Sequence, residues 1–344
     1  MLVGFEGRVA PGWLLEAIAA GRCGGVVLFA RNLGAPPEVA ALSQALVDAA
    51  PASAPELVIA IDQEGGRVQR LRAPLTVWPP MARLGLRDDP ALTEQVGRAI
   101  GEELRALGIN LDFAPVCDVA TNPDNPVIGD RAFGDTPERV AAQAAAFLRG
   151  LEDAGVRGCA KHFPGHGDTA VDSHLDLPRV EHSLERLRAV ELPPFRALIE
   201  AGVGMVMTAH LVAAALDGQP ATLSAAWIDG VLRRELGFSG VVASDDLDMK
   251  AVADRFTVDQ VVQGALGAGV DLLLCCRDPD RRQAVEAALS RAADDPVLGP
   301  RVQASLGRVR AFRASLAPGA PRAAEDLAEL FPDEDHQALA ASIG

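Results

Sequence analysis

Residues 158–174 read GCAKHFPGHGDTAVDSH, an apolar strand-like run that passes directly into a polar loop. The run Gly158–His162 is short and almost wholly apolar, which is typical of a strand buried on both faces of a parallel sheet. Pro164, Gly165 and Gly167 exclude a helix over most of the loop. A buried strand that ends in charged side chains and a long loop favours an α/β fold whose loops carry function.

Seven further runs resemble Gly158–His162, and helix-like stretches lie between most of them. The expected strands are 2–5, 25–29, 57–62, 110–114, 158–162, 205–209, 241–245 and 271–275. Apolar residues recur at helical spacing in 37–49, 91–107, 137–154, 184–201, 225–236 and 258–268. Glycines at 108, 155, 202 and 237 each come after one of these stretches, as helix C-terminal stops do.

Eight strands that alternate with helices predict a single-domain (β/α)8 TIM barrel. An open doubly wound sheet is the alternative, but no G-x-G-x-x-G fingerprint follows any strand. We expect the barrel to span residues 1–315. From Leu316 onward the composition shifts to Ala, Pro, Asp and Glu, so residues 316–344 are expected to form an acidic tail with short helices near 326–330 and 337–343.

Charge and composition exclude several classes of partner. The net charge is −15, so the surface repels nucleic acid and anionic membranes. Nothing in the sequence indicates an obligate protein partner. The five cysteines show no zinc-type spacing and are expected to be reduced and buried. The N-terminus has no basic leader and no apolar stretch is long enough to span a membrane, so we expect a cytoplasmic location.

Unusual polar residues collect at the C-terminal ends of the expected strands, the end at which barrel enzymes build their active sites. The stretch 62–70 reads DQEGGRVQR, where the paired glycines permit a tight turn. Asp62 could accept hydrogen bonds from sugar hydroxyls, and Arg67 and Arg70 could hold a carbonyl or carboxylate. An Asp–Arg pair that only fixes the loop is the alternative.

The loop after residue 162 allows two kinds of chemistry. His162 and His166 have the spacing of a helical zinc pair, but they do not lie on a helix, so metal binding is the weaker interpretation. Asp172 and His174 are two residues apart, and a bend could bring them together for acid–base chemistry, with Asp orienting the imidazole. A surface His beside a surface Asp is the plain alternative.

A third candidate site is Ser244-Asp245-Asp246-Leu247, which comes directly after the apolar run that ends at Ala243. A carboxylate at this strand end could attack an anomeric carbon, as a retaining glycosidase requires. It could also bind a metal. Because neighbouring strand residues point to opposite faces, we expect only one of the two aspartates to reach the centre.

Taken together, these motifs resemble glycoside hydrolase family 3, and within it the NagZ-type β-N-acetylglucosaminidases. The resemblance rests on DQEGGRVQR, on IGDRAFG at 128–134, on KHFPGHGDTAVDSH and on SDDLDM, in this order along most of the chain. It implies a (β/α)8 barrel and a retaining, two-step mechanism. We expect the compact single-domain form of the family, without the additional C-terminal domain of many larger members.

The resemblance also assigns roles to individual residues. Asp245 matches the family nucleophile, and Asp246 is the fallback. The acid/base falls on His174, with Asp172 as its partner in an Asp–His dyad. The family's sugar-binding positions fall on Asp62, Arg70, Arg131, Lys161 and His162. No metal and no organic cofactor are implied.

The substrate that the resemblance implies is a small carbohydrate, β-1,4-linked N-acetylglucosamine on anhydro-N-acetylmuramic acid, released as muropeptides during cell-wall turnover. Two alternatives remain. A neutral His does not repel phosphate, so the chain could be a phosphorylase of the same family. It could also be a non-catalytic sugar-binding regulator that kept the fold.

Overall fold

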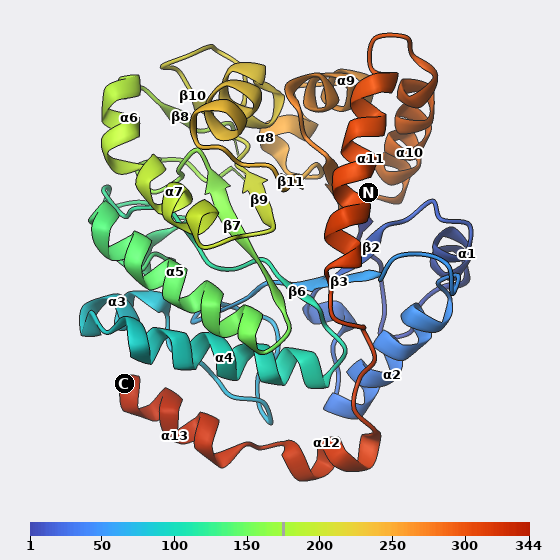
Figure 1. The fold of residues 1–344 in the computed structure, drawn as a ribbon, viewed down its shortest axis with the longest axis vertical. Coiled ribbons are helices and arrows are strands. Elements are labelled where there is room, and N and C mark those ends of the chain that lie inside the picture. Colours follow the sequence, from blue (N-terminus) through green and yellow to red (C-terminus); the bar gives the residue numbers. More distant parts are fainter. Residues whose placement is uncertain (174–175) are drawn as a thin grey trace.

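The structure of the chain is a computed structural model that describes residues 1–173 and 176–344. Eight parallel strands close into a barrel in the order β1, β2, β3, β6, β7, β9, β11, β12 and back to β1 (Figure 1). The predicted (β/α)8 barrel is therefore confirmed and the open sheet is wrong. The strands are β1 Leu2–Val3, β2 Gly25–Leu28, β3 Val58–Ile61, β6 Leu111–Asp112, β7 Arg157–Phe163, β9 Met205–Thr208, β11 Val241–Asp246 and β12 Leu272–Cys275.

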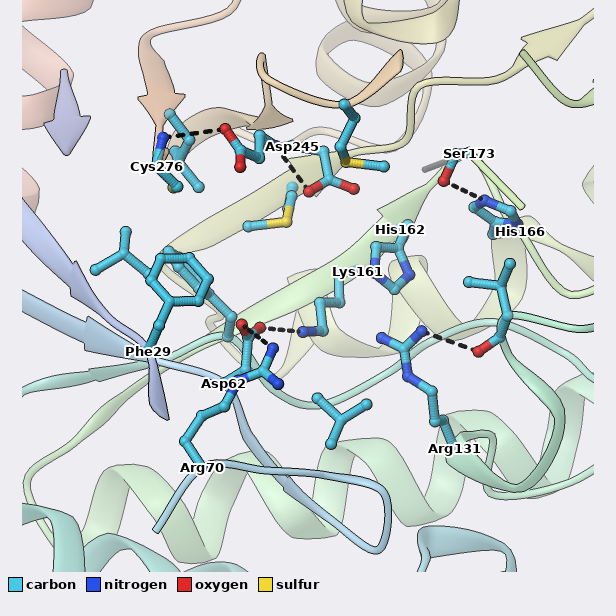
Figure 2. A pocket seen from close by; sticks show the side chains of 18 residues that line it. Phe29, Asp62, Arg70, Arg131, Lys161, His162, His166, Ser173, Asp245 and Cys276 are labelled. Atoms are coloured by element: carbon cyan, nitrogen blue, oxygen red, sulfur yellow. Dashed lines mark hydrogen bonds and ion pairs between the residues drawn. The ribbon is translucent and has the colours of Figure 1, made fainter. Parts of the chain in front are cut away.

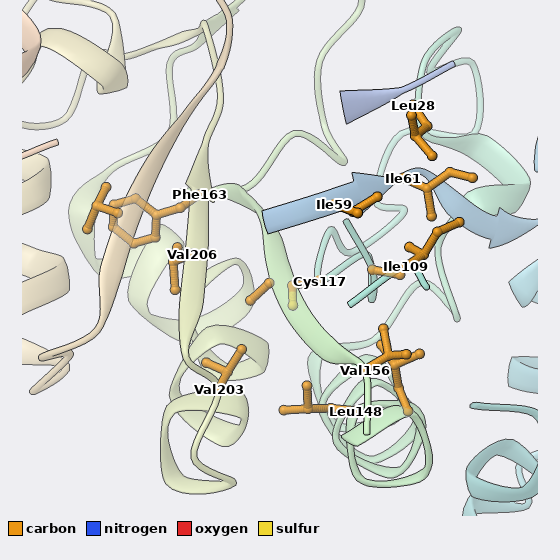
Figure 3. Packing of buried hydrophobic residues seen from close by; sticks show 14 of the residues in the cluster. Leu28, Ile59, Ile61, Ile109, Cys117, Leu148, Val156, Phe163, Val203 and Val206 are labelled. Carbon is orange, nitrogen blue, oxygen red and sulfur yellow. The ribbon is translucent and has the colours of Figure 1, made fainter. Parts of the chain in front are cut away.

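Apolar residues follow one another without interruption along the strands because each strand buries both of its faces. On β3, Val58 and Ala60 point into the barrel, whereas Ile59 and Ile61 point outward into the layer below the helices. Figure 3 shows this outer layer, where Ile59 and Ile61 lie in the same cluster as Leu148 of the helix α5 Pro137–Asp153. Both layers are nearly free of solvent, so alternation between apolar and polar residues is absent from the strands.

The predicted helices are present, with one division. The stretch 184–201 forms two helices, α6 Leu184–Val190 and α7 Leu192–Glu200, which meet at Glu191. Pro193 and Pro194 lack the amide hydrogens that a continuous helix would require there. The other predicted helices are α2 Pro36–Asp48, α4 Pro90–Ala106, α5, the π-helix η4 Ala226–Glu235 and α9 Val258–Ala268.

Further helices complete the outer shell. They are α1 Gly12–Ala19, α3 Met81–Arg87, α8 Lys250–Ala253, α10 Pro279–Asp294 and α11 Gly299–Ala314. Near the end of α11, Phe312 and Leu316 join the cluster inside the barrel, so this segment closes the N-terminal end of the barrel. The opposite end, where the strands terminate, stays available for a site.

The C-terminal tail runs along the outside of the barrel (Figure 1). It contains α12 Ala324–Leu330, which packs against α2, and α13 Glu334–Ile343, which packs against α3 and α4. Leu327 and Ile343 are buried by this packing. Across residues 1–173 and 176–344, none of the helices is both long and apolar enough to cross a membrane.

Candidate active site

A cavity of about 170 Å³ opens at the C-terminal end of the barrel strands. Figure 2 shows six of the eight predicted site residues around it: Asp62, Arg70, Arg131, Lys161, His162 and Asp245. Of the remaining two, Asp172 is described but does not line this cavity, and His174 lies outside the described residues. The lining also includes Val27, Phe29, Val68, Phe113, Val127, His166, Ser173, Met207, Asp246, Met249, Leu274 and Cys276.

Asp62 lies just after β3 and binds two cations at the floor of the cavity. Lys161 on β7 donates from Nζ to Asp62 Oδ1 at 2.9 Å, and Arg70 donates from Nη2 to Oδ2 at 3.1 Å. Burial by itself would raise the pKa of Asp62, but Lys161 and Arg70 outweigh it and hold the pKa below its ordinary value. The Asp–Arg pair that stood as the alternative to sugar binding therefore exists, but both of its residues line the cavity.

Glu64 is a buried residue of this cluster that sequence reasoning missed. It receives two hydrogen bonds from Arg131, from Nε and Nη2, both at 2.8 Å, and its Oε1 lies 2.6 Å from Lys161 Nζ. Burial raises the pKa of Glu64, but the two cations bring it to about 2. Glu64 stands two residues after Asp62 in DQEGGR, and this position could have identified it as a site residue from the sequence.

His162 is held by a second missed residue, Asp118, which is fully buried. His162 Nδ1 lies 2.7 Å from Asp118 Oδ2, and the backbone N–H of His166 donates to Oδ1 at 2.6 Å. Burial opposes ionisation of Asp118, but His162 and His166 lower its pKa overall. Asp118 thus orients the imidazole of His162 and fixes the turn after β7.

Asp245 and Asp246 both line the cavity, so the expectation that only one would reach the centre is wrong. The register of β11 against β12 advances by three residues, from Ala243 to Asp246, while β12 advances by two. This bulge lets both residues contribute to the wall of the cavity. The same irregularity occurs in β7 against β9 between Ala160 and Phe163, and Lys161 and His162 likewise both face the cavity.

The two aspartates differ in their surroundings. Asp245 Oδ1 accepts the backbone N–H of Asp246 at 2.8 Å. Asp246 Oδ1 accepts the N–H groups of Asp248 and Cys276, each at 3.1 Å. Burial, and then the Asp248 and Asp245 carboxylates, raise the pKa of Asp246 to about 7. Near neutrality, therefore, much of Asp246 carries a proton.

The loop after β7 is tied down by polar contacts. Asp168 accepts from Thr121 Oγ1 at 2.8 Å and lies 2.6 Å from His182 Nε2. The backbone N–H of Asp176 donates to the carbonyl of Asp172 at 3.0 Å, and the side chain of Asp176 pairs with Arg255. Asp168 therefore shapes the loop.

Arg67 also shapes a loop, and it does not line the cavity. It donates from Nη2 to the carbonyls of Val127 at 2.6 Å and Ile128 at 2.9 Å, and it pairs with Asp130 at 3.0 Å. In this way it holds the segment 127–131, which carries Arg131. In residues 1–173 and 176–344, no three His, Cys, Asp or Glu side chains gather as metal ligands.

A closed parallel barrel with carboxylates, cations and histidines at its mouth defines the class of (β/α)8-barrel enzymes. Residues 14–311 match the N-terminal domain of glycosyl hydrolase family 3, and the chain belongs to this family. A β-hexosaminidase of Alkalilimnicola ehrlichii is 41% identical over 315 residues, covering 90% of this chain and 88% of that protein. The chain is accordingly a glycosidase of the β-N-acetylhexosaminidase type.

Solved structures agree with this assignment. NagZ from Neisseria gonorrhoeae, in complex with N-trifluoroacetyl-D-glucosamine, superimposes with a TM-score of 0.82 at 32% identity, covering 100% of this chain and 96% of that one. A family 3 β-N-acetylglucosaminidase from a Paenibacillus species gives a TM-score of 0.90 at 40% identity. The match covers 99% of this chain and 66% of that longer chain.

Proposed function

We propose that this enzyme is a retaining exo-β-N-acetylglucosaminidase that forms a covalent glycosyl intermediate on Asp245. One observation carries the proposal: the Asp245 carboxylate faces, across one small cavity, the cluster of Asp62, Arg131, Lys161 and His162 (Figure 2). A sugar held by that cluster would lie between its binding groups and a carboxylate nucleophile, as a double displacement requires.

The raised pKa and the backbone contacts of Asp246 favour Asp245 as the nucleophile. A nucleophilic carboxylate must be ionised when it attacks. The pKa of Asp246 is raised to about 7, and its Oδ1 is occupied by two backbone N–H groups. Asp245 accepts one such bond, and no residue in 1–173 or 176–344 hydrogen-bonds its second oxygen.

The sugar-binding groups are arranged before any substrate enters. Asp62, Arg70 and Lys161 are fixed by ion pairs, and Arg131 is fixed by Glu64. Buried cations and carboxylates with fixed directions can exchange hydrogen bonds with sugar hydroxyls and with an N-acetyl carbonyl without further ordering. This supports Asp62, Arg70, Arg131, Lys161 and His162 as substrate-binding residues.

We assign proton transfer to His174, with Asp172 as its orienting partner. The leaving alcohol needs a proton in the first step, and water must lose one in the second. An imidazole with a pKa of about 6.5 can do both near neutrality. The support is the family membership together with the position of Ser173, the residue between them, in the wall of the cavity.

For the physiological role, we propose hydrolysis of N-acetylglucosaminyl-anhydro-N-acetylmuramic acid and its peptide-bearing forms during peptidoglycan recycling in the cytoplasm. The solved NagZ of Neisseria gonorrhoeae, 96% of whose chain is covered by the match, is in complex with N-trifluoroacetyl-D-glucosamine, which supports the glucosamine part of this substrate. The five cysteines are free and buried, which suits a reducing compartment. No cofactor enters this chemistry.

The experiment that tests the function is product analysis with a defined muropeptide, with and without phosphate. We expect free N-acetylglucosamine with retained β configuration, at a rate indifferent to phosphate. Phosphate-dependent release of N-acetylglucosamine 1-phosphate would identify a phosphorylase instead. Failure to cleave any aryl β-N-acetylglucosaminide would point to a non-catalytic sugar-binding protein.

A paired substitution tests the nucleophile. Asp245→Asn should abolish turnover of aryl and natural substrates alike, because the amide cannot form the glycosyl ester. Asp246→Asn, which keeps an oxygen for the backbone N–H groups, should still turn over. Substrate hydrolysis in a stopped assay measures both. Equal activity of Asp245→Asn and the wild type would refute the assignment.

A further inference from the structure

His166 lines the same cavity but belongs to neither the proposed nucleophile nor the proposed sugar-binding set. We propose that His166 is a positioning residue that fixes the segment carrying Asp172 and His174 by holding the Ser173 hydroxyl on its Nε2 atom. This inference rests on the proposed function, because it concerns the residues to which proton transfer is assigned. Figure 2 shows His166 and Ser173 facing each other beside His162.

The backbone of His166 is fixed on both sides. Its N–H donates to Asp118 Oδ1 at 2.6 Å, and its carbonyl accepts from Asn125 Nδ2 at 2.8 Å. Asn125 also receives the N–H groups of Val127 and Ile128 on its Oδ1, both at 2.9 Å. The turn at His166 is thereby locked to the segment that leads to the proposed sugar-binding residue Arg131.

The hydrogen bonds of Thr169 assign the tautomer of His166. Thr169 Oγ1 has a single hydrogen, and it donates this hydrogen to the carbonyl of His166 at 3.0 Å. It also lies 2.6 Å from His166 Nδ1, and with the hydroxyl hydrogen on the carbonyl we assign the proton of this contact to Nδ1. His166 Nε2 then keeps its lone pair and accepts from Ser173 Oγ, 3.2 Å away.

The imidazole stays neutral in this position. His166 is only 2% exposed, and burial lowers its pKa to about 4, although the neighbouring Asp118 acts in the opposite direction. A neutral ring can accept from a hydroxyl, whereas a protonated ring cannot. The bond to Ser173 therefore has the same polarity over the whole neutral range.

Ser173 transmits this anchorage along the chain. It is 2% exposed, and its carbonyl accepts the N–H of Ala251 at 3.3 Å, so the residue is held from two directions. Between the turn and Ser173, Ala170 and Val171 are exposed. Ser173 is covalently joined to both Asp172 and His174. An anchor at this residue limits how far a proton donor can shift, and a misplacement of 1 Å can cost about 100-fold in rate.

The test uses two amide substitutions, each of which keeps one of the two side-chain hydrogen bonds of His166. His166→Asn places an amide near the Nδ1 position, toward Thr169, and gives up the contact with Ser173. His166→Gln places an amide near the Nε2 position, toward Ser173. Ser173→Ala removes the hydroxyl itself. For each variant, kcat/KM is measured with a nitrophenyl and with an alkyl β-N-acetylglucosaminide, and thermal unfolding checks the fold.

We expect His166→Asn and Ser173→Ala to lose about 10- to 100-fold on the alkyl glycoside and far less on the nitrophenyl glycoside, whose leaving group needs little protonation. His166→Gln should recover much of the loss. The double variant His166→Asn/Ser173→Ala should be no worse than the more impaired single variant, because both remove one contact.

Equal losses on the two glycosides, or no recovery in His166→Gln, would overturn the inference, since a purely structural role affects both substrates alike. Its failure is separable from that of the proposed function through His174→Ala. If His174→Ala discriminates between the leaving groups and His166→Asn does not, only the positioning role fails. If His174→Ala does not discriminate either, the assigned acid fails.

Discussion

At the scale of the residue, the site is built from charges that neutralise one another before substrate arrives. Lys161 is 2% exposed and sits between the carboxylates of Asp62 and Glu64. Desolvation would lower its pKa, but the two carboxylates raise it above its ordinary value. A buried ammonium group that stays ionised keeps a fixed set of donors for hydroxyl oxygens.

The acid role of His174 makes a prediction at this scale. His174→Ala should slow cleavage of unactivated alkyl glycosides most, by about 10²- to 10⁴-fold, because positioned acid catalysis contributes that much. Phenolic glycosides should lose less. The slope of log kcat/KM against leaving-group pKa measures the difference, and an unchanged slope would count against the assignment.

Asp112 makes a second prediction, on pH and stability. This residue of β6 is fully buried, its Oδ1 accepts the N–H of Gln63 at 2.9 Å, and no hydrogen bond from the described residues reaches its Oδ2. Burial raises its pKa from 3.8 to about 8. As the pH rises, Asp112 loses its proton at a lower pH in the unfolded chain than in the folded protein. Ionisation therefore favours the unfolded chain, and Asp112 lowers the stability of the fold progressively between about pH 4 and pH 8.

Asp112→Asn should remove this loss. Relative to the wild type, its melting temperature should rise as pH is raised from 5 to 8, as calorimetry can measure. The exposed Asp294 provides the control, because Asp294→Asn makes the same substitution at a position that is not buried. A constant difference between Asp112→Asn and the wild type across this range would contradict the pKa shift.

At the scale of the element, two bulged strands decide which side chains reach the cavity. Regular alternation would send one residue of each neighbouring pair away from the barrel axis. In β7 and β11 the extra residue brings both members of a pair to the mouth. The strands of this barrel therefore position twice as many functional groups at those two places as a regular strand could.

Close helix packing makes a prediction at the same scale. The helices α4 and α5 approach so closely that a Cβ on Gly150 would lie 1.9 Å from the carbonyl oxygen of Glu94. Because that atom belongs to the backbone of α4, the helices would have to separate. Gly150→Ala should lower the free energy of unfolding by about 1–3 kcal/mol in denaturant titration.

A helical glycine with open space around it provides the control for Gly150→Ala, because there an added methyl group should not lower stability. A Cβ on Gly307, in α11, would meet no atom within 4 Å beyond the neighbouring backbone of its own helix. Gly307→Ala should be neutral or stabilise by up to about 1 kcal/mol through helix propensity. If the two substitutions had the same effect, the contact between α4 and α5 would not be the cause.

At the scale of the whole molecule, the tail joins distant parts of the chain. We propose that residues 316–344 form a strap on the barrel rather than a separate domain. His336 of α13 lies 3.2 Å from a Glu102 carboxylate oxygen and 3.4 Å from one of Glu103, both on α4. Burial would lower the pKa of His336, but Glu103, Asp333 and Glu102 raise it overall.

This arrangement predicts that the tail docks more firmly at lower pH. A raised histidine pKa contributes stability that is present below the unfolded value of about 6.5 and lost as pH rises through the folded pKa. Limited proteolysis of the tail should therefore be slower at pH 6 than at pH 8. In His336→Gln the difference should vanish, whereas His182→Gln, whose site is remote from the tail, should keep it. Equal rates in the wild type at both pH values would refute the prediction.

The sequence by itself determined the barrel and most of the site. Eight continuous apolar runs define strands that are buried on both faces. Each run can be recognised within its own short stretch of sequence, without knowledge of its partners in the fold. The charges that end those runs, from Asp62 to Asp245, fall at one mouth because parallel strands share a direction.

Tertiary structure alone decided the rest. Glu64 and Asp118 acquire their roles from partners 67 and 44 residues away, and no local pattern fixes such pairs. Both Asp245 and Asp246 line the cavity because of the register of β11 against β12, and this register is fixed by the pairing of the two strands. Likewise, the neutral state of His166 results mainly from its burial by the folded loop, which lowers the pKa of the imidazole.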